Sequence, residues 1–248
     1  DLNLTHFRNK ITKLPPNQAK NGIVTGTKKL FEGRGIYDFW LREYAGVDAA
    51  NGDALYYMDI TDTDGKVTGR KLTNVYNNGT FYFHGSALPD ITGGLTNSFN
   101  YKNFELSILT TFAYGGLFYD SNYGGIMHRG SAGTAWHADI LNRWQKPGDV
   151  TNVPRLENAL GGQDGASTRW LVDGSYINIK NVTLSYALPS NLANRLRMGG
   201  TSIFANVDNA YLFTAKKGLD PQRAFTGTAD ASYVPFRTFT VGLNITLQ

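Results

Sequence analysis

The most regular pattern in the chain lies in residues 91–114, which read ITGGLTNSFNYKNFELSILTTFAY. Alternate residues in both halves of this stretch are mostly apolar or aromatic, and those between them are mostly small or polar. A period of two is typical of a β-strand with one apolar and one polar face. The short segment Tyr101-Lys102-Asn103 separates the two halves, which predicts a long hairpin with a tight turn.

Similar alternation recurs toward the end of the chain. Residues 238–247 alternate most cleanly, and residues 176–186 and 202–213 follow the same rule. Residues 36–45 and 54–60 are weaker strand candidates, and residues 2–11 resemble the tail of a strand whose partner lies outside the chain. The sequence therefore predicts an antiparallel all-β protein.

The composition excludes several classes of protein. The chain has 248 residues, 28 glycines, 13% aromatic residues and no cysteine, so disulfides and thiolate chemistry are excluded. A net charge of +4 is too small and too dispersed to indicate a nucleic-acid partner. The uncharged stretch 106–119 is interrupted by polar residues and is shorter than the roughly 20 apolar residues of a membrane helix.

The connections between predicted strands differ in length at the two ends. Short turns are expected at residues 101–103 and 189–191, whereas residues 60–90, 115–168 and 214–234 are long and rich in Gly and Asp. Short turns at one end and long loops at the other are typical of outer-membrane β-barrels. Tyr101 and Tyr186 lie near strand ends, where aromatic side chains suit a membrane interface. Soluble β-sandwiches also place aromatics at strand ends, so this alternative stays open.

A series of short motifs gives the chain a family resemblance. They follow one another in the order YAGVD (44–48), NGDALYY (51–57), DTDGKV (62–67), PDITGGL (89–95), FNYKNFEL (99–106), RWQKPGD (143–149), VPR (153–155), DGSYI (173–177), KNVTLSYALP (180–189) and GLDP (218–221). In this order they resemble the C-terminal part of SusC-like (RagA-type) TonB-dependent outer-membrane transporters of Bacteroidota. The resemblance covers nearly the whole chain, from about residue 31 to residue 248.

The resemblance implies a transmembrane barrel of about 22 strands, of which residues 1–248 supply the C-terminal portion and from which the plug domain is absent. Its long loops, near residues 61–89, 116–168 and 214–233, would be extracellular, and the C-terminus periplasmic. Such transporters import oligosaccharides or peptides, with a SusD-like surface lipoprotein as partner and TonB acting through the plug. One departure is the ending Thr246-Leu247-Gln248, where related barrels commonly finish on an aromatic residue.

The strand parity assigns side chains to two environments. The small polar side chains at residues 107, 111, 240 and 244 suit the wide, plugged lumen of a large barrel. The remaining barrel and plug are expected outside this chain. The apolar side chains on the other face of the strands would contact the lipid bilayer. The predicted lipid-facing residues are Ile91, Leu95, Phe99, Phe104, Leu106, Ile108, Phe112, Val182, Leu184, Phe239, Val241, Leu243, Ile245 and Leu247.

The second long loop holds the candidates for contact with substrate or with the lipoprotein. Aromatic and hydrogen-bonding side chains of this kind can stack on sugars or hold a peptide backbone. The candidates are Tyr119, Tyr123, His128, Arg129, Trp136, Arg143 and Trp144. Trp144, within a motif of the resemblance, favours a structural or partner-facing role, and Trp136 is the better candidate for substrate or lipoprotein contact.

The sequence offers little for catalysis or metal binding. His128 and His137 have no zinc-site spacing, and no acid/base pair indicates an enzyme. The stretch from Asp59 to Gly65 has clustered carboxylates before a glycine, as in calcium-binding loops. A turn stabilised by Asp side chains is the simpler interpretation. No cofactor and no catalytic residue are expected. Two alternatives from other classes remain: a soluble all-β carbohydrate-binding module and a β-sandwich enzyme.

Overall fold

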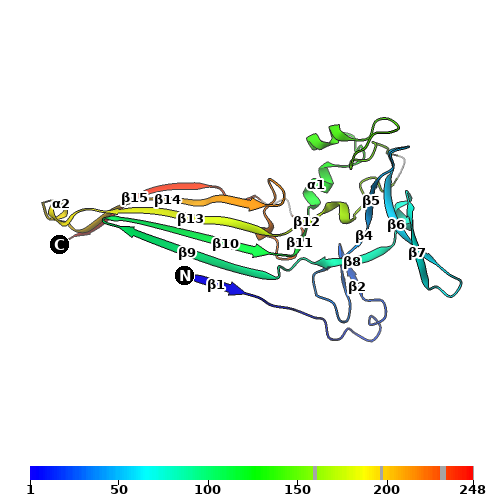
Figure 1. Ribbon diagram of the computed structural model, residues 1–248, viewed down its shortest axis with the longest axis horizontal. Helices are drawn as coiled ribbons and strands as arrows, with labels where there is room; N and C mark the ends of the chain where they lie inside the picture. Colours follow the sequence, from blue (N-terminus) through cyan, green and yellow to red (C-terminus); the bar gives the residue numbers. More distant parts are fainter. Residues whose placement is uncertain (159–160, 196–197, 230–232, 248) are drawn as a thin grey trace.

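The computed structural model describes residues 1–158, 161–195, 198–229 and 233–247, and its elements form two parts (Figure 1). One part is a long six-stranded antiparallel sheet, and the other is a set of short elements gathered at one end of that sheet. The sheet has the order β1-β9-β10-β13-β14-β15. Its strands are β1 (Leu2–Thr5), β9 (Ile91–Tyr101), β10 (Phe104–Tyr114), β13 (Tyr176–Ala187), β14 (Met198–Thr214) and β15 (Thr238–Leu247).

The hairpin predicted from residues 91–114 is confirmed. Strands β9 and β10 pair without a break from Phe104↔Tyr101 to Tyr114↔Ile91, and Lys102 adopts a φ of 52° in the tight turn between them. Each later strand of the sheet pairs with the one before it. All three long connections therefore leave from the same end of the sheet, as the connection lengths predicted.

Two expectations from the sequence are wrong. The partner of the first strand lies within the chain, because β1 pairs with β9 in the register Leu2↔Leu95. The connection from β13 to β14 is longer than a tight turn and contains helix α2 (Ser190–Arg195). The long connections also contain short strands that period-two patterns did not reveal: residues 61–89 alone contain β7 (Val67–Thr73) and β8 (Phe81–Ser86).

A pair of bulges interrupts the sheet at Lys180. Strand β13 has one extra residue relative to β10 there, and β14 has two residues, Asn209 and Ala210, opposite Lys180. Asn209 has a φ of 51°, and its Oδ1 accepts a hydrogen bond of 2.7 Å from Lys180 Nζ. An extra residue reverses strand parity. Odd-numbered Ile177 and Ile179 therefore lie on the same face of the sheet as even-numbered Val182 and Leu184.

The described residues of the three long connections form one folded unit, which we call the loop body (residues 6–90, 115–158, 161–175, 215–229 and 233–237). It contains the sheet β2-β3-β4-β8, the sheet β5-β6-β7 and the pair β11-β12. The remaining bounds are β2 (Ile23–Thr25), β3 (Lys28–Leu30), β4 (Asp38–Arg42), β5 (Tyr44–Val47), β6 (Ala54–Thr61), β11 (Leu117–Tyr119), β12 (Leu171–Asp173), α1 (Ser121–Ile126), and the 3-10 helices 76–78, 138–142, 168–170 and 221–223.

The loop body has a hydrophobic core of its own. Phe39 and Leu41 from the first connection pack with Met127, Ile140 and Trp170 from the second. The third connection joins through a bridge between Tyr119 and Thr228, and Lys28 Nζ donates to Thr228 Oγ1 at 3.0 Å. No helix within the described residues is long and apolar enough to cross a membrane.

Candidate functional site

The six-stranded sheet has one continuous apolar face. The registers place the predicted lipid-facing side chains of β9, β10, β13 and β15 on this face together, and the structure adds residues that the prediction left out. The side chain of Leu247 lies outside the described part. Most of the large apolar side chains on the face are exposed, from 40% at Ile91 to 79% at Val241. The added residues are Leu2, Leu4, Ile177, Ile179, Ile203, Val207, Tyr211 and Phe213.

Aromatic side chains lie at both ends of this face. Tyr101, Phe104 and Tyr186 lie near the short turn, where the Phe104 and Tyr186 rings are 4.7 Å apart. Tyr114 and Phe213 lie at the loop end, and both are exposed. Ten residue steps separate Phe104 from Tyr114, which is about 33 Å along a strand. At a barrel tilt of about 40°, that length spans roughly 25 Å, the height of the apolar band of an outer-membrane barrel.

The opposite face of the sheet is mostly small and polar, although Leu109, Phe204 and Leu212 also lie on it. On β13 and β14, Asn181 Nδ2 donates to Asn206 Oδ1 at 2.6 Å and to Asp208 Oδ1 at 2.7 Å. Asn206 Nδ2 donates to the other Asp208 oxygen at 2.8 Å, and Thr183 Oγ1 lies 2.8 Å from Asn206 Oδ1. This ladder satisfies its own polar groups across two strands, as expected of a face that borders a hydrated or polar interior.

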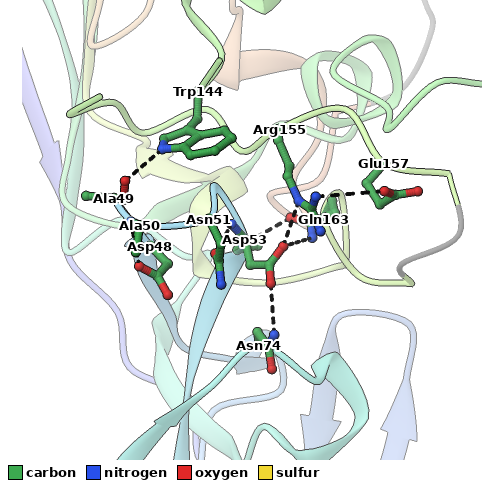
Figure 2. A network of polar contacts seen from close by, with 11 residues as sticks. Asp48, Ala49, Ala50, Asn51, Asp53, Asn74, Trp144, Arg155, Glu157 and Gln163 are labelled. Carbon is green, nitrogen blue, oxygen red and sulfur yellow. Dashed lines mark hydrogen bonds and ion pairs between the residues drawn. The ribbon is translucent and has the colours of Figure 1, made fainter. Parts of the chain in front are cut away.

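Within the loop body, four motifs of the family resemblance, at residues 44–48, 51–57, 143–149 and 153–155, meet at one turn (Figure 2). The segment 144–155 of the second connection packs against the turn between β5 and β6, residues 48–53, and hydrogen-bonds to it. Trp144 Nε1 donates to the carbonyl of Ala49 at 3.0 Å, and the Arg155 backbone N–H donates to the carbonyl of Gly52 at 2.9 Å. Gly52 has a φ of 79°, and a Cβ there would lie 2.4 Å from the Trp144 ring. We call this arrangement the turn clamp.

Asp53 is the buried anion of the turn clamp. Its side chain is 5% exposed, and its Oδ1 accepts a 2.9 Å hydrogen bond from Arg155 Nε while its Oδ2 accepts one of 2.9 Å from Asn74 Nδ2. Gln163 lies beside it and accepts from the backbone N–H of Ala54 at 2.8 Å. Figure 2 shows these side chains converging on Asp53 from three separate segments. A buried carboxylate with several donors is stable only while all of them stay in place.

Burial also sets the protonation of the neighbouring groups. It raises the pKa of Tyr44 and of Tyr123 to about 12, and it lowers the pKa of Arg169. The phenols therefore stay protonated and donate: Tyr44 Oη to the Asn152 carbonyl at 3.1 Å, and Tyr123 Oη to Asp139 Oδ2 at 2.6 Å. The Arg169 guanidinium donates to the Gln163 carbonyl at 3.0 Å. These groups hold the loop body together at neutral pH and do not form an acid/base pair.

The structure divides the predicted contact candidates into two groups. Tyr119 and His128 are buried, and Tyr123 packs against the core, so these side chains support the loop body and have little surface for a ligand. Trp144 is held in the turn clamp. Trp136 is 44% exposed, stacks on His128 with ring centroids 5.1 Å apart, and donates through Nε1 to the His128 carbonyl.

The other two candidates, Arg129 and Arg143, are half-buried. The backbone N–H of Arg129 donates to Asp164 Oδ2 at 3.1 Å, and Arg143 Nη1 lies 3.4 Å from the carbonyl of Ile140. Trp136 thus presents the largest exposed ring among the predicted candidates. In the sequence, Trp136 is the better candidate for substrate or lipoprotein contact because it lies outside the motifs of the resemblance, whereas Trp144 lies within one.

The possible calcium loop is a turn. Asp62 Oδ1 accepts from the backbone N–H groups of Asp64 and Lys66 at 3.1 and 2.8 Å, and Gly65 has a φ of 78°. Asp59 instead hydrogen-bonds the hydroxyl of Tyr82. Among the described residues, no group of three or more His, Cys, Asp or Glu side chains could hold a metal ion.

The two-faced sheet with all its long connections at one end defines a segment of an outer-membrane-type β-barrel wall. Comparisons with known proteins agree. The chain is 28% identical to TonB-dependent receptor P3 of Formosa agariphila over 98% of its own length, and 25% identical to the TonB-dependent receptor SusC of Bacteroides thetaiotaomicron over 98%. A solved structure of the RagAB peptide transporter superposes on 98% of the chain with a TM-score of 0.83 at 24% identity. No protein-family model matches.

The resemblance to SusC-like TonB-dependent receptors is thereby confirmed, and so is the all-β, partial-barrel fold. The chain spans about a quarter of the length of these relatives: 26% of the Formosa receptor, 24% of SusC and 26% of the matched RagAB chain. The relatives are named as receptors and transporters rather than enzymes, in agreement with the prediction from the sequence.

Proposed function

We propose that the chain forms part of the barrel wall of a TonB-dependent importer in a bacterial outer membrane. The observation that carries this proposal is the exposed apolar face, which runs across six strands and ends in aromatic side chains. Exposing such a face to water would cost about 25 cal/mol of free energy for each Å² of apolar surface, whereas contact with lipid would not carry this cost. The predicted lipid-facing residues are then in contact with acyl chains, and the polar ladder borders the lumen.

In this orientation the loop body is extracellular and the short connections are periplasmic. Strand β15 runs toward the short-connection end, because Leu247 pairs with Met198, so the C-terminal residues of the chain lie on the periplasmic side. Substrate is an oligosaccharide or a peptide, and a SusD-like lipoprotein contacts the loop body, with exposed Trp136 as a contact candidate. TonB acts through a plug outside this chain. The support is the naming of the relatives as TonB-dependent receptors, SusC and a peptide transporter.

A soluble carbohydrate-binding sandwich fits the structure less well. A sandwich needs a second sheet about 10 Å away that covers the apolar face. In the described part of the chain the large side chains of that face are instead largely exposed, and the loop body lies beyond the ends of the strands (Figure 1).

Arginine substitutions on the two faces test the proposal. Ile108 and Ser107 are neighbours near the middle of β10 and lie on opposite faces. Ile108→Arg should disfavour assembly by about 2–4 kcal/mol, because a cation would face the middle of the bilayer, whereas Ser107→Arg should change it by less than about 1 kcal/mol. The measurement is the fraction of full-length protein that is heat-modifiable in outer-membrane fractions. Equal assembly of both variants would contradict the proposal.

A further inference from the structure

A pocket opens at the loop end of β14, beside the apolar face. It has a volume of about 490 Å³ and lies between β14 and the connection that follows it. Strand β15 pairs with β14 only as far as Asp208↔Thr238, so residues 209–214 have no strand partner on that side among the described residues. The connection folds back over this edge, and Asn209 Nδ2 donates to the carbonyl of Phe236 at 3.0 Å.

Two exposed cations line the pocket. Lys217 and Arg237 line it and are exposed, and within the described residues neither has an ion-pair or hydrogen-bond partner. The neighbouring Lys216 differs, because it pairs with Asp120 at 2.8 Å. The carboxylate that lines the pocket, Asp220, is buried, and its Oδ1 accepts from the backbone N–H and the Nε2 of Gln222. Among the described lining residues, two cations and one anion give a charge of +1.

The same pocket is continuous with the apolar face. Tyr211 and Phe213 line it, lie on the apolar side of β14, and are each 52% exposed. Their ring centroids are 4.5 Å apart. A ligand that fits both features must combine an anionic group with a long apolar part.

We infer that this pocket binds the phosphate-bearing headgroup of a membrane lipid. Lys217 and Arg237 hold the phosphate through charge-assisted hydrogen bonds, and the acyl chains lie along Tyr211, Phe213 and the apolar face. The inference rests on the proposed membrane position of the sheet. It adds to that position a specific site in the leaflet at the loop end.

The test uses the full-length transporter in detergent and native mass spectrometry. The probe is a lipid A carrying two phosphates, and the reference is the same lipid after removal of its phosphates. Lys217→Ala combined with Arg237→Ala should lower the population of the lipid-bound species about tenfold, the order expected for losing charge-assisted contacts. The matched control is Lys66→Ala combined with Lys71→Ala. It removes two exposed cations from the hairpin β6-β7, which lies far from the six-stranded sheet (Figure 1).

The wild-type protein should bind the dephosphorylated lipid as weakly as the double variant binds the phosphorylated one, and excess inorganic phosphate should not displace the lipid. Equal lipid binding by the wild type and the Lys217/Arg237 variant would overturn the inference. Full displacement by inorganic phosphate would also overturn it, because the site would then recognise the free anion. Heat-modifiable migration is measured in parallel. If the wild type assembles in the membrane but the expected differences in lipid binding are not seen, the lipid-site inference is wrong and the proposed barrel function stands.

Discussion

At the scale of single residues, Gly52 decides whether the turn clamp can close. It combines a positive φ with contact against the Trp144 ring, whereas Gly65 has nearly the same φ, 78°, and open space around it. Gly65→Ala should cost about 1 kcal/mol from backbone strain alone. Gly52→Ala should cost about 2–4 kcal/mol, because the new methyl group also displaces the indole. The amides of Gly148 and Arg155 donate to the carbonyls of Ala49 and Gly52 at 2.8 and 2.9 Å, so their hydrogen exchange measures the opening of the clamp. Equal effects of the two substitutions would contradict this account.

Asp53 gives a second prediction at the same scale. Asp53→Ala removes the common acceptor of Arg155 and Asn74 and should destabilise the loop body by about 2–4 kcal/mol. Glu43→Ala breaks the exposed pair with Arg70, 2.7 Å long, and should cost less than about 1 kcal/mol. The comparison is read from the exchange rate of the Ala54 amide, whose acceptor is Gln163. A larger effect of Glu43→Ala would show that the buried carboxylate is not central to the clamp.

The sequence showed the motifs that supply the residues of the turn clamp, but it did not predict that these residues are in contact. Trp144 and Arg155 lie about a hundred positions from Asp53, and a single sequence carries no information on which distant side chains touch. The motif series indicated a family without indicating that four of its motifs converge on one turn. The same limit explains why Tyr119 and His128 stood among the contact candidates, although their side chains are buried in the loop body.

At the scale of elements, the paired bulges set the faces of β13. Deleting Lys180 would remove the extra residue and leave Ile179 and Val182 on the same face without a bulge. Deleting Thr183 from the regular part of β13 would instead shift Leu184 and Tyr186 to the polar face, and we expect it to reduce the assembled fraction at least as much as Ile108→Arg does. Deleting Asn191 from the connection between β13 and β14 should have a much smaller effect, because it lies outside the sheet. The fraction of heat-modifiable protein compares the deletions of Thr183 and Asn191, and normal assembly without Thr183 would contradict the assigned parity.

The strands of the sheet were the most predictable elements, because each is long enough to show several periods of alternation. The bulge left a trace in the sequence: apolar residues at 177 and 179 are followed by apolar residues at 182 and 184, a change of parity across Lys180-Asn181. The short strands of the loop body left no such trace. Their stability comes from the shared core around Phe39 and Trp170, a tertiary effect that no local pattern encodes.

At the scale of the whole molecule, the chain has two faces, and the proposed membrane position accounts for both. The apolar face is exposed over six strands, the polar ladder of β13 and β14 lies on the reverse, and the loop body lies at one end of the sheet (Figure 1). The low hydropathy of the chain as a whole does not conflict with the proposed position, because in it only alternate strand residues would contact lipid.

The most direct test is a spin-label scan along β10 in the reconstituted full-length protein. Single cysteines are placed in turn at positions 104–114, where the chain has none of its own. Collision of each label with oxygen, which concentrates in lipid, is compared with collision with a water-soluble nickel complex. Oxygen accessibility should peak at the even positions, including Leu106, Ile108 and Phe112, and fall at the odd ones. Preferential access of the nickel complex at those even positions would contradict the assignment of the apolar face to lipid.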